Sequence, residues 1–555
     1  MVHEPSYRDR SVRLSTERIA SQAGAGWADR IILDYFDEHR RRIPGKPAIV
    51  SLLAETGATK RVSFGELGDA VDRIALRLFR LGVRRGDVVS FQLNNRWEFI
   101  ALSLACVRLG ALQNPLMPVL RERELRFMLG LAESKIFVVP RSFRQFDHAV
   151  LAEKLKAELP ALEHVIVLEG TDGSALTGPP SEFDAADFAR FVEPLRPHPN
   201  DLMQLLYTSG TTGEPKGVMH TANTILANVV ATGERFAASR EDVMFCPSPL
   251  AHQLGFLWGL LLPMMVGATT VLLDVWKPDL AAKLLAEEKA TICMGATPFL
   301  ADLTDFHGTG DMRLGAFRLF ISGGAPIPSA LVRRARANLG ATIVSVWGMT
   351  EVCAATTVRL DDAEEKAFGT DGVAVPHMAV RVVDGKGSEL PNGTEGHLQT
   401  RGASVFVGYL KRPQLNAFAT DDWFETGDLA RRDQDGYIRI TGRSKDVIIR
   451  GGENLPVVEI EAVLYKHPAV AQVAIVAMPD QRLGERPCAY VRLRAGTSLT
   501  LPDVQAFLGA QGVSKSFMPE RLEIIEEMPM TATGKVQKFV LREMASSLTH
   551  EIRKG

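Results

Sequence analysis

Tyr207-Thr-Ser-Gly-Thr-Thr-Gly-Glu-Pro-Lys-Gly217 is the most informative segment of this sequence. It follows an apolar run, residues 202–206, that predicts a buried strand, and it precedes residues 221–230, which predict a helix with Thr221 at or near its N-cap. Glycines let the backbone turn its N–H groups inward, hydroxyls add short donors, and a lysine adds a mobile positive charge. Such a loop is suited to hold a polyphosphate. The groups expected to do so are Thr208, Ser209, Gly210, Thr211, Thr212, Gly213 and Lys216.

This loop is not a Walker A loop, because the pattern Gly-x-x-x-x-Gly-Lys-[Ser/Thr] does not occur in it. The remaining alternative is an ordinary surface turn, which would also be rich in Ser, Thr and Gly. The density and the order of these residues favour the phosphate-binding interpretation.

The composition, 46% hydrophobic and 23% charged, is that of a globular protein, and the length of 555 residues suggests more than two folding units. A formal net charge of −2 gives no electrostatic reason to expect nucleic acid as a partner. The five cysteines are widely spaced and form no C-x-x-C pair, which argues for a reducing compartment and against a structural zinc site. The first ten residues contain no apolar run of the secretory type. We therefore predict a cytoplasmic protein.

Residues 254–273 are apolar enough to be mistaken for a membrane span. They contain Gly255, Gly259, Pro263 and Gly267, and they end in the β-prone run Thr-Thr-Val-Leu-Leu273. We expect a core helix, a turn and a buried strand instead. The sequence therefore predicts no transmembrane segment.

Short apolar runs alternate with helical periods from about residue 63 to residue 346, a pattern typical of α/β layers with a mainly parallel sheet. Residues 63–66, Ser-Phe-Gly-Glu, fit a capping box at the start of one such helix. Beyond about residue 376 the sequence becomes rich in short strands, and residues 442–446 interrupt it with charge. The last part has a βα pattern of its own. We predict a large α/β domain, residues 1–443, with a β-rich part at about 376–443, and a small α+β domain, residues 444–555.

Four other segments are polar and glycine-rich. Ser322-Gly-Gly-Ala-Pro326 and Trp347-Gly-Met-Thr-Glu351 each follow a predicted strand, at the end where open α/β sheets bind ligands. An indole suits stacking on a base, and a carboxylate suits Mg²⁺. Trp423-Phe-Glu-Thr-Gly-Asp428 offers a carboxylate to paired hydroxyls, and Thr531-Ala-Thr-Gly-Lys535 presents a lysine on a glycine turn. Taken singly, each residue has a structural explanation: Trp347 in a core, Asp428 in a turn, Lys535 on the surface and His252 as a packed histidine.

Taken together and in this order, these segments resemble the adenylate-forming superfamily of acyl-CoA synthetases, adenylation domains and luciferases. The resemblance extends from about residue 30 to residue 545 and is carried by the loop at 207–217 and by residues 347–351, 423–428, 436–461 and 533–538. Within the superfamily, residues 294–300, 448–454 and 482–490 are similar to CoA ligases for short-chain, medium-chain and alicyclic acids, the cyclohexanecarboxylate–CoA ligase type.

The resemblance implies ATP, Mg²⁺ and coenzyme A as cofactors and assigns roles to single residues. Lys535, Thr208, Glu351 and His252 are the expected catalytic residues, with Thr208 and Glu351 at the metal. The loop would hold the β- and γ-phosphates. Gly324, Ala325 and Trp347 would border the adenine, Asp428 and Arg443 the ribose, and Lys535 would reach the acyl carboxylate and the α-phosphate. Further expected cofactor-binding residues are Gly323, Gly348, Met349, Thr350, Ile440, Lys445, Gly451, Gly452 and Glu453.

The resemblance also implies that the small domain rotates about Lys445 between two half-reactions, with Gly451 and Gly452 then lining a pantetheine tunnel. Many members of the superfamily carry Asp at this hinge, so Lys445 is a mild departure. The acyl pocket would contain His252, Gly255, Phe256, Thr297, Gly323, Met349 and Thr350, a set that suits a compact uncharged acid.

Three functions remain open from the sequence. The first is an acyl-CoA synthetase that acts on a small-molecule carboxylic acid. The second is a ligase that passes the acyl-AMP to a carrier protein, and the third is a non-catalytic nucleotide-binding regulator. The complete set Thr208, Lys216, Glu351, Asp428 and Lys535 argues against the third. Cyclohexanecarboxylate, a medium-chain fatty acid and an aryl acid all remain open as substrates, and so does the oligomeric state, a homodimer included.

Overall fold

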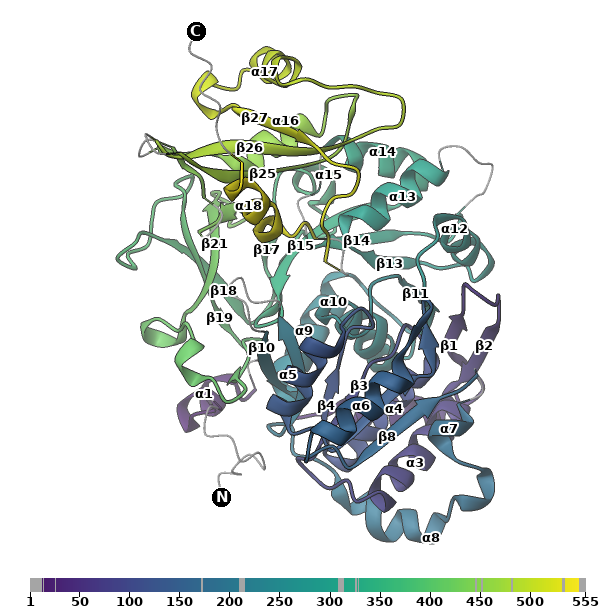
Figure 1. Ribbon diagram of the computed structural model, residues 1–555. Coiled ribbons are helices and arrows are strands. Elements are labelled where there is room, and N and C mark those ends of the chain that lie inside the picture. The colour runs from purple at the N-terminus through teal and green to yellow at the C-terminus, as the bar shows by residue number, and fades with distance from the viewer. Residues whose placement is uncertain are drawn as a thin grey trace.

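The computed structural model describes residues 12, 14–24, 26–170, 173–208, 215–307, 314–324, 327, 329–444, 447–450, 453–480, 483–531 and 535–548. It has a large N-terminal domain and a small C-terminal domain, which lies at the top of Figure 1, so the predicted fold class is confirmed. The boundary between residues 443 and 444 stays a prediction. The expected hinge, Lys445, lies outside the described residues.

The large domain contains two sheets whose central strands are parallel. In the described chain, the strand order of the first sheet is β17 (Val373–Ala374), β16 (Cys353–Thr357), β15 (Thr342–Met349), β14 (Leu319–Gly323), β13 (Ile292–Gly295), β11 (Val243–Cys246), β12 (Thr269–Leu273), β1 (Pro47–Leu52) and β2 (Thr59–Ser63). The order of the second is β20 (Gly408–Tyr409), β10 (Lys216–Thr221), β9 (Leu202–Thr208), β4 (Leu112–Pro115), β3 (Val88–Phe91), β5 (Ile136–Pro140) and β8 (His164–Leu168).

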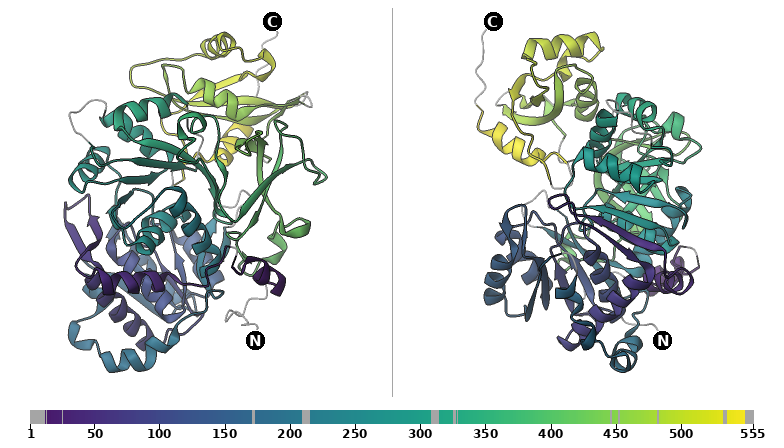
Figure 2. Two further views of the ribbon diagram at one scale, coloured as in Figure 1. Left: turned by 180° about the vertical axis from the view of Figure 1, so that it is seen from behind. Right: turned by 90° about the vertical axis from the view of Figure 1, so that its right-hand side faces the viewer.

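Helices lie between the two sheets and on both outer faces. The shared core between the sheets is built with α2 (Ile32–Arg42), α3 (Phe64–Arg80), α4 (Trp97–Leu109), α9 (Ala222–Arg235) and α11 (Leu262–Val266). The outer face of the first sheet packs on α12 (Pro278–Glu287), α13 (Thr297–His307) and α14 (Ser329–Leu339). The outer face of the second packs on α5 (Glu122–Ala132) and α6 (His148–Glu158). Figure 2 shows these layers from two further sides.

The β-rich part and the small domain complete the architecture. An antiparallel sheet contains β18 (Met378–Val383), β19 (Gly396–Gly402), β21 (Phe424–Arg432) and β22 (Ile438–Arg443). The small domain contains β23 (Ile449–Arg450), β24 (Glu453–Asn454), β25 (Val470–Asp480), β26 (Gly484–Leu493) and β27 (Arg521–Ile524), with α16 (Val457–Leu464), α17 (Leu501–Ala510) and α18 (Lys538–Ser546).

Shorter elements connect these parts. They are α1 (Thr16–Gln22), the hairpin of β6 (Ser142–Phe143) and β7 (Phe146–Asp147), α7 (Ser174–Thr177), α8 (Ala185–Asp187), α10 (Gln253–Gly255), the π-helix η4 (Phe256–Leu261) and α15 (Ala363–Lys366).

Several local predictions are confirmed by the structure. The Oγ atom of Ser63 accepts from the Glu66 N–H, and the Glu66 carboxylate accepts from the Ser63 N–H, so the capping box opens α3. Residues 254–273 fold into α10, η4, α11 and β12 and are largely buried. In the part of the chain that is described, no helix has the length and apolarity that a membrane span requires.

The local structure around the polyphosphate loop differs from the expectation in one respect. Between strand β9 and helix α9 lies a further strand, β10, which pairs antiparallel with β9 so that Lys216 is opposite Thr208. The loop therefore joins two antiparallel strands instead of leading directly into a helix. Its residues Ser209, Gly210, Thr211, Thr212 and Gly213 lie outside the described residues.

A buried ion pair stands at the start of α4. The Arg96 guanidinium donates to both oxygens of Glu98, at 2.8 and 2.5 Å, and to the Gly170 carbonyl at 2.9 Å. The two side chains are only 7% and 1% exposed. Because a buried charge is costly without its partner, each ion depends on the other.

We expect Glu98→Ala to lower the free energy of unfolding by about 3–5 kcal/mol, since it leaves the Arg96 cation buried and unpaired. Glu169→Ala is the matched control, because it removes the partner of Arg141 from a pair whose side chains are 56% and 64% exposed. The control change is expected to cost less than about 1 kcal/mol. Urea unfolding monitored by circular dichroism measures both, and equal losses would contradict this role of burial.

Candidate active site between the two domains

The carboxyl edge of the parallel strands of the first sheet carries most of the predicted site. Strand β14 ends at Gly323, β15 ends at Met349 just before Glu351, and the segment after β11 leads to His252. Parallel strands bring their carboxyl ends to one edge of a sheet, where α/β proteins bind ligands. The structure thus brings together segments that lie about a hundred residues apart in sequence.

Lys535 reaches this edge from the small domain. A hairpin-like turn holds it: Thr531 N–H donates to the Lys535 carbonyl at 2.7 Å, and Lys535 N–H donates to Thr531 Oγ at 3.0 Å. Gly324 has a φ of +88°, and a Cβ placed on it would lie 3.1 Å from Lys535 Cε. Figure 1 shows the yellow segment after β27 descending from the small domain toward the large one. The lysine of one domain therefore packs on the glycine turn of the other.

The Lys535 ammonium lies in a field of mixed charge. Burial and the neighbouring Arg443 guanidinium lower the pKa of Lys535 from the ordinary 10.5, while the Asp428 and Glu351 carboxylates raise it in turn. Lys535 in turn affects His252: burial together with the Lys535 charge lowers the pKa of His252 to about 3. His252 is therefore neutral at physiological pH, and the positive charge of this region comes from Lys535 and Arg443.

Asp428 is fixed by two donors from different parts of the fold. Arg443 Nε donates to its Oδ1 at 2.8 Å, from the residue directly opposite on β22, and the Trp347 indole N–H donates to its Oδ2 at 2.9 Å. The indole is 8% exposed and packs in the core of the β-rich part. Trp347 thus orients a carboxylate, a contact that the sequence did not predict. Each carboxylate oxygen keeps a lone pair for a further donor.

Glu351 and Thr208 each contribute one oxygen atom that has no hydrogen-bond partner in the described part of the chain. Tyr409 OH donates to Glu351 Oε1 at 2.7 Å, and Lys216 Nζ donates to Tyr409 OH at 3.1 Å. Glu351 Oε2 and Thr208 Oγ are buried, and within the described ranges neither finds a hydrogen-bond partner. A buried oxygen atom in that state costs about 1–3 kcal/mol, which makes a missing ligand the natural explanation.

These two oxygen atoms fit a magnesium ion that arrives with a nucleotide. Mg²⁺ prefers oxygen ligands and is commonly held by one or two protein oxygens together with substrate phosphates. The described residues contain no cluster of three or more His, Cys, Asp or Glu side chains that would bind a metal alone. The donor set therefore suits a metal–phosphate complex better than a free structural ion.

A buried histidine, His220, stabilises the turn that carries Glu351. His220 Nε2 lies 2.7 Å from the Thr350 carbonyl and therefore donates to it, and Nδ1 lies 3.1 Å from Thr224 Oγ. Burial lowers the pKa of His220 to about 4, in agreement with a neutral ring that donates from Nε2. The Phe406 N–H also donates to the Glu351 carbonyl, at 2.7 Å.

The expected acyl-pocket residues lie around the same edge. His252 caps α10, and a Cβ on Gly255 would lie 2.1 Å from the Pro249 carbonyl oxygen, so only glycine fits there. Phe256 opens the π-helix η4 and is fully buried in the core between the sheets. Thr297 begins α13. A π-helical turn inside a helix often accompanies a functional site.

Some predicted residues cannot be placed and others were missed. Ala325, Lys445, Gly451 and Gly452 lie outside the described residues, as do the five residues of the loop, and of Glu453 only the backbone in β24 is described. Gly348 lies in β15 and Ile440 in β22. Sequence reasoning missed Tyr409 and His220. The only signals that could have indicated them are the Gly-Tyr pair that contains Tyr409 and the position of His220 in β10, the strand that follows the loop.

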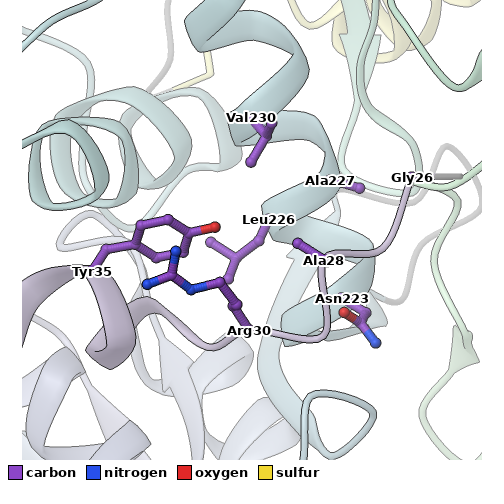
Figure 3. A pocket seen from close by; sticks show the side chains of 8 residues that line it. All are labelled: Gly26, Ala28, Arg30, Tyr35, Asn223, Leu226, Ala227 and Val230. Carbon is purple, nitrogen blue, oxygen red and sulfur yellow. The ribbon is translucent and has the colours of Figure 1, made fainter. Parts of the chain in front are cut away.

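A small separate cavity lies away from this site, against α9 (Figure 3). Its volume is about 40 Å³, and it is lined by Gly26, Ala28, Arg30, Tyr35, Asn223, Leu226, Ala227 and Val230. The Arg30 guanidinium lies 3.9 Å from the centroid of the Tyr35 ring. This volume has room for a few water molecules and not for a nucleotide.

Comparison with known proteins identifies two family models that match separate parts of the chain. A family model described as AMP-binding enzyme matches residues 36–410, and one described as AMP-binding enzyme C-terminal domain matches residues 459–535. The chain is 38% identical to the medium-chain fatty-acid–CoA ligase of Escherichia coli over 95% of its own length and 92% of that protein. It is 33% identical to a salicylyl-CoA synthase / salicylate adenylyltransferase of a Streptomyces species, over 93% and 94%.

The fold is also similar to solved structures. The crystal structure of ATP-bound MatB from Rhodopseudomonas palustris matches with a TM-score of 0.80 and 29% identity, over 93% of this chain and 99% of that one. The apo structure of the same protein covers the same shares but has a TM-score of 0.71. The present arrangement is therefore more similar to the ATP-bound structure than to the apo structure.

We predict that Gly324→Ala displaces the Lys535 side chain, because the added methyl group would lie 3.1 Å from Lys535 Cε. Gly340→Ala is the matched control, since Gly340 also has a positive φ, +68°, but faces open space. Both changes carry about 1–2 kcal/mol of backbone strain. Brief acetylation followed by mass spectrometry should modify Lys535 several-fold faster in Gly324→Ala than in the wild type or the control. Equal rates in all three proteins would show that the lysine does not pack on this turn.

Proposed function

Because this chain belongs to the AMP-binding enzyme family, we propose that it is an AMP-forming acid–CoA ligase for an uncharged medium-chain or alicyclic carboxylic acid. Its cofactors are ATP, Mg²⁺ and coenzyme A. The acid first displaces pyrophosphate from ATP to give an acyl-AMP, and the thiol of CoA then displaces AMP. The observation that carries this proposal is the approach of Lys535, from the small domain, to the carboxyl edge that holds Gly324 and Glu351 and to Asp428 on β21.

The first half-reaction brings an anion against a polyanion. A carboxylate oxygen forms a bond to the α-phosphorus as the bond to the β-phosphate oxygen breaks, and pyrophosphate leaves with the electron pair. Charge neutralisation and positioning are the main catalytic resources for such a displacement. Lys535 supplies a mobile positive charge for the carboxylate and the α-phosphate, and Lys216 supplies one for the β- and γ-phosphates. When these phosphates bind, they favour the protonated form of Lys535 against the effect of burial.

The remaining groups position the nucleotide. Thr208 and Glu351 hold the metal, which when bound neutralises phosphate charge. Ser209, Gly210, Thr211, Thr212 and Gly213 complete the loop around the phosphates. The pair of donors on Asp428 supports a role as acceptor for the ribose hydroxyls, next to Arg443 and Ile440. Gly323, Gly324, Ala325 and the turn from Trp347 to Thr350 border the adenine and the acid.

The second half-reaction needs room for a thiol where Lys535 stands. We propose that residues 444–555 rotate as a unit about Lys445, which withdraws Lys535 and brings the segment of Gly451, Gly452 and Glu453 to the site. Arg450, next to these glycines, donates to Glu520 at 2.5 Å, and Arg486 bridges Glu520 to Asp480. This ion-pair network would hold Arg450 and its strand β23 to the rest of the small domain as one rigid body.

The residues expected around the acid indicate that the substrate carries no second charged group. Neutral His252 and the apolar Phe256 and Met349 give no partner for a second charge on the substrate, and no Asp lies in residues 249–256. Similarity to a medium-chain fatty-acid–CoA ligase supports an apolar acid, with cyclohexanecarboxylate as our specific candidate. The alternatives are an aryl acid, favoured by the salicylyl relative, and transfer to a carrier protein instead of CoA. We place the enzyme in the cytoplasm, where the five free cysteines remain reduced.

We predict that Lys535→Ala abolishes the first half-reaction and spares the second. Acid-dependent exchange of pyrophosphate into ATP should fall by about three orders of magnitude, because the charge that bridges carboxylate and α-phosphate is lost. Formation of acyl-CoA from supplied acyl-AMP should change less than about threefold, since Lys535 is withdrawn in that step. Equal losses in the two assays would refute the proposal that Lys535 acts in the first half-reaction and not in the second. Lys538→Ala, on the same segment, is the control.

We predict CoA-dependent release of AMP with cyclohexanecarboxylate and with C6–C10 fatty acids, measured as kcat/KM across a panel that includes aryl and amino acids. Amino acids should be inactive because no Asp lies in residues 249–256 to pair with their ammonium group. A preference for salicylate or benzoate would establish the aryl alternative. Pyrophosphate exchange without release of AMP to CoA would establish transfer to a carrier protein.

A further inference from the structure

Tyr409 contacts both a cation and an anion of the proposed nucleotide site. Its hydroxyl donates to Glu351 Oε1 at 2.7 Å and accepts from Lys216 Nζ at 3.1 Å, and the ammonium lies 4.4 Å from the centroid of the ring. A phenol has one proton and two lone pairs, so both bonds form at the same time. The neutral Tyr409 hydroxyl therefore links the Glu351 carboxylate, which follows β15, to Lys216 on β10.

The fold fixes Tyr409 in place on several sides. Its strand β20 pairs with β10, with Tyr409 opposite Val218, and its N–H donates to Asn416 Oδ1 at 3.1 Å. The ring packs edge-on against Phe406, with centroids 4.8 Å apart, and the residue is 1% exposed. Because backbone and ring are both held, the hydroxyl has one position from which to bind its two partners.

This bond decides which oxygen of Glu351 is left for a ligand. Oε1 is occupied by the Tyr409 proton, so the carboxylate is turned with Oε2 buried and, among the described residues, unpartnered. Thr208 Oγ is in the same state, and Thr208 is the cross-strand partner of Lys216. Groups that hydrogen-bond to a metal ligand orient it and tune its affinity for the ion. The geometry of Tyr409 is that of such a group.

We propose that Tyr409 is the positioning residue of the metal site: its hydroxyl orients Glu351 toward the Mg²⁺ of Mg-ATP and at the same time holds Lys216 beside the phosphates. This inference rests on the proposed assignment of Glu351 and Thr208 to the metal. Tyr409 itself touches neither the ion nor the reacting atoms. Its effect is to set the metal ligand and the phosphate-binding lysine as one unit.

The test is the Mg²⁺ dependence of ATP binding to Tyr409→Phe, measured by calorimetry across a range of Mg²⁺ concentrations and in EDTA. We expect the Mg²⁺ concentration that supports half-maximal ATP binding to rise by about 10- to 100-fold, with a much smaller change in affinity for metal-free ATP. Tyr437→Phe is the matched control, because Tyr437 is also buried and also donates to a carboxylate, that of Asp362, away from this site. It should keep the wild-type dependence. A wild-type dependence in Tyr409→Phe would overturn the inference.

The variant Glu351→Gln distinguishes a failure of the proposed role of Tyr409 from a failure of the assignment of Glu351 to the metal. If Glu351→Gln binds Mg-ATP as the wild type does, the metal assignment fails. If Glu351→Gln raises the Mg²⁺ concentration needed for half-maximal ATP binding and Tyr409→Phe does not, only the role of Tyr409 fails. We expect the double variant to lose no more Mg²⁺ affinity than Glu351→Gln alone. Glu351→Asp serves if Tyr409→Phe does not fold: its shorter carboxylate cannot reach both the hydroxyl and the metal, and an unchanged Mg²⁺ dependence would contradict the proposal.

Discussion

The approach of a lysine ammonium from one domain to a carboxyl edge of another is the interaction around which this molecule is arranged. Burial and the Arg443 guanidinium oppose the charge on Lys535, and Asp428 and Glu351 favour it. Such a balance leaves the ammonium ready to respond to new negative charge, which a carboxylate and a triphosphate would bring.

One short segment from each domain forms this contact. Gly324 offers a turn without a side chain, and the Thr531 hydrogen bonds shape the turn that carries Lys535. On the large domain, Asp428 and Glu351 are each held by a second residue, Trp347 and Tyr409, that comes from a different element of the fold. A rigid receiving surface and a movable charge are what a two-step enzyme with one site requires.

The sequence predicted what local chemistry controls. Apolar runs predicted the strands that end at Gly323 and Met349, and the capping box at Ser63 was read from two residues. Strand β10 was missed because its pairing with β9 is a tertiary event and only Val218 and Met219 form an apolar pair within it. Tyr409 was missed because it is 58 residues from Glu351 and 193 from Lys216 in sequence, and a Gly-Tyr pair carries no chemical signal of its own.

Affinity labelling with an AMP ester that carries an aldehyde on its phosphate tests directly whether the small domain delivers Lys535 to the nucleotide. The aldehyde forms an imine with any amine beside the α-phosphate, borohydride fixes it, and mass spectrometry locates it. We expect the label on Lys535, and we expect ATP to protect against it. If Lys535 is recovered unmodified while other lysines carry the label, the lysine does not complete the nucleotide site and the mechanism proposed above is wrong.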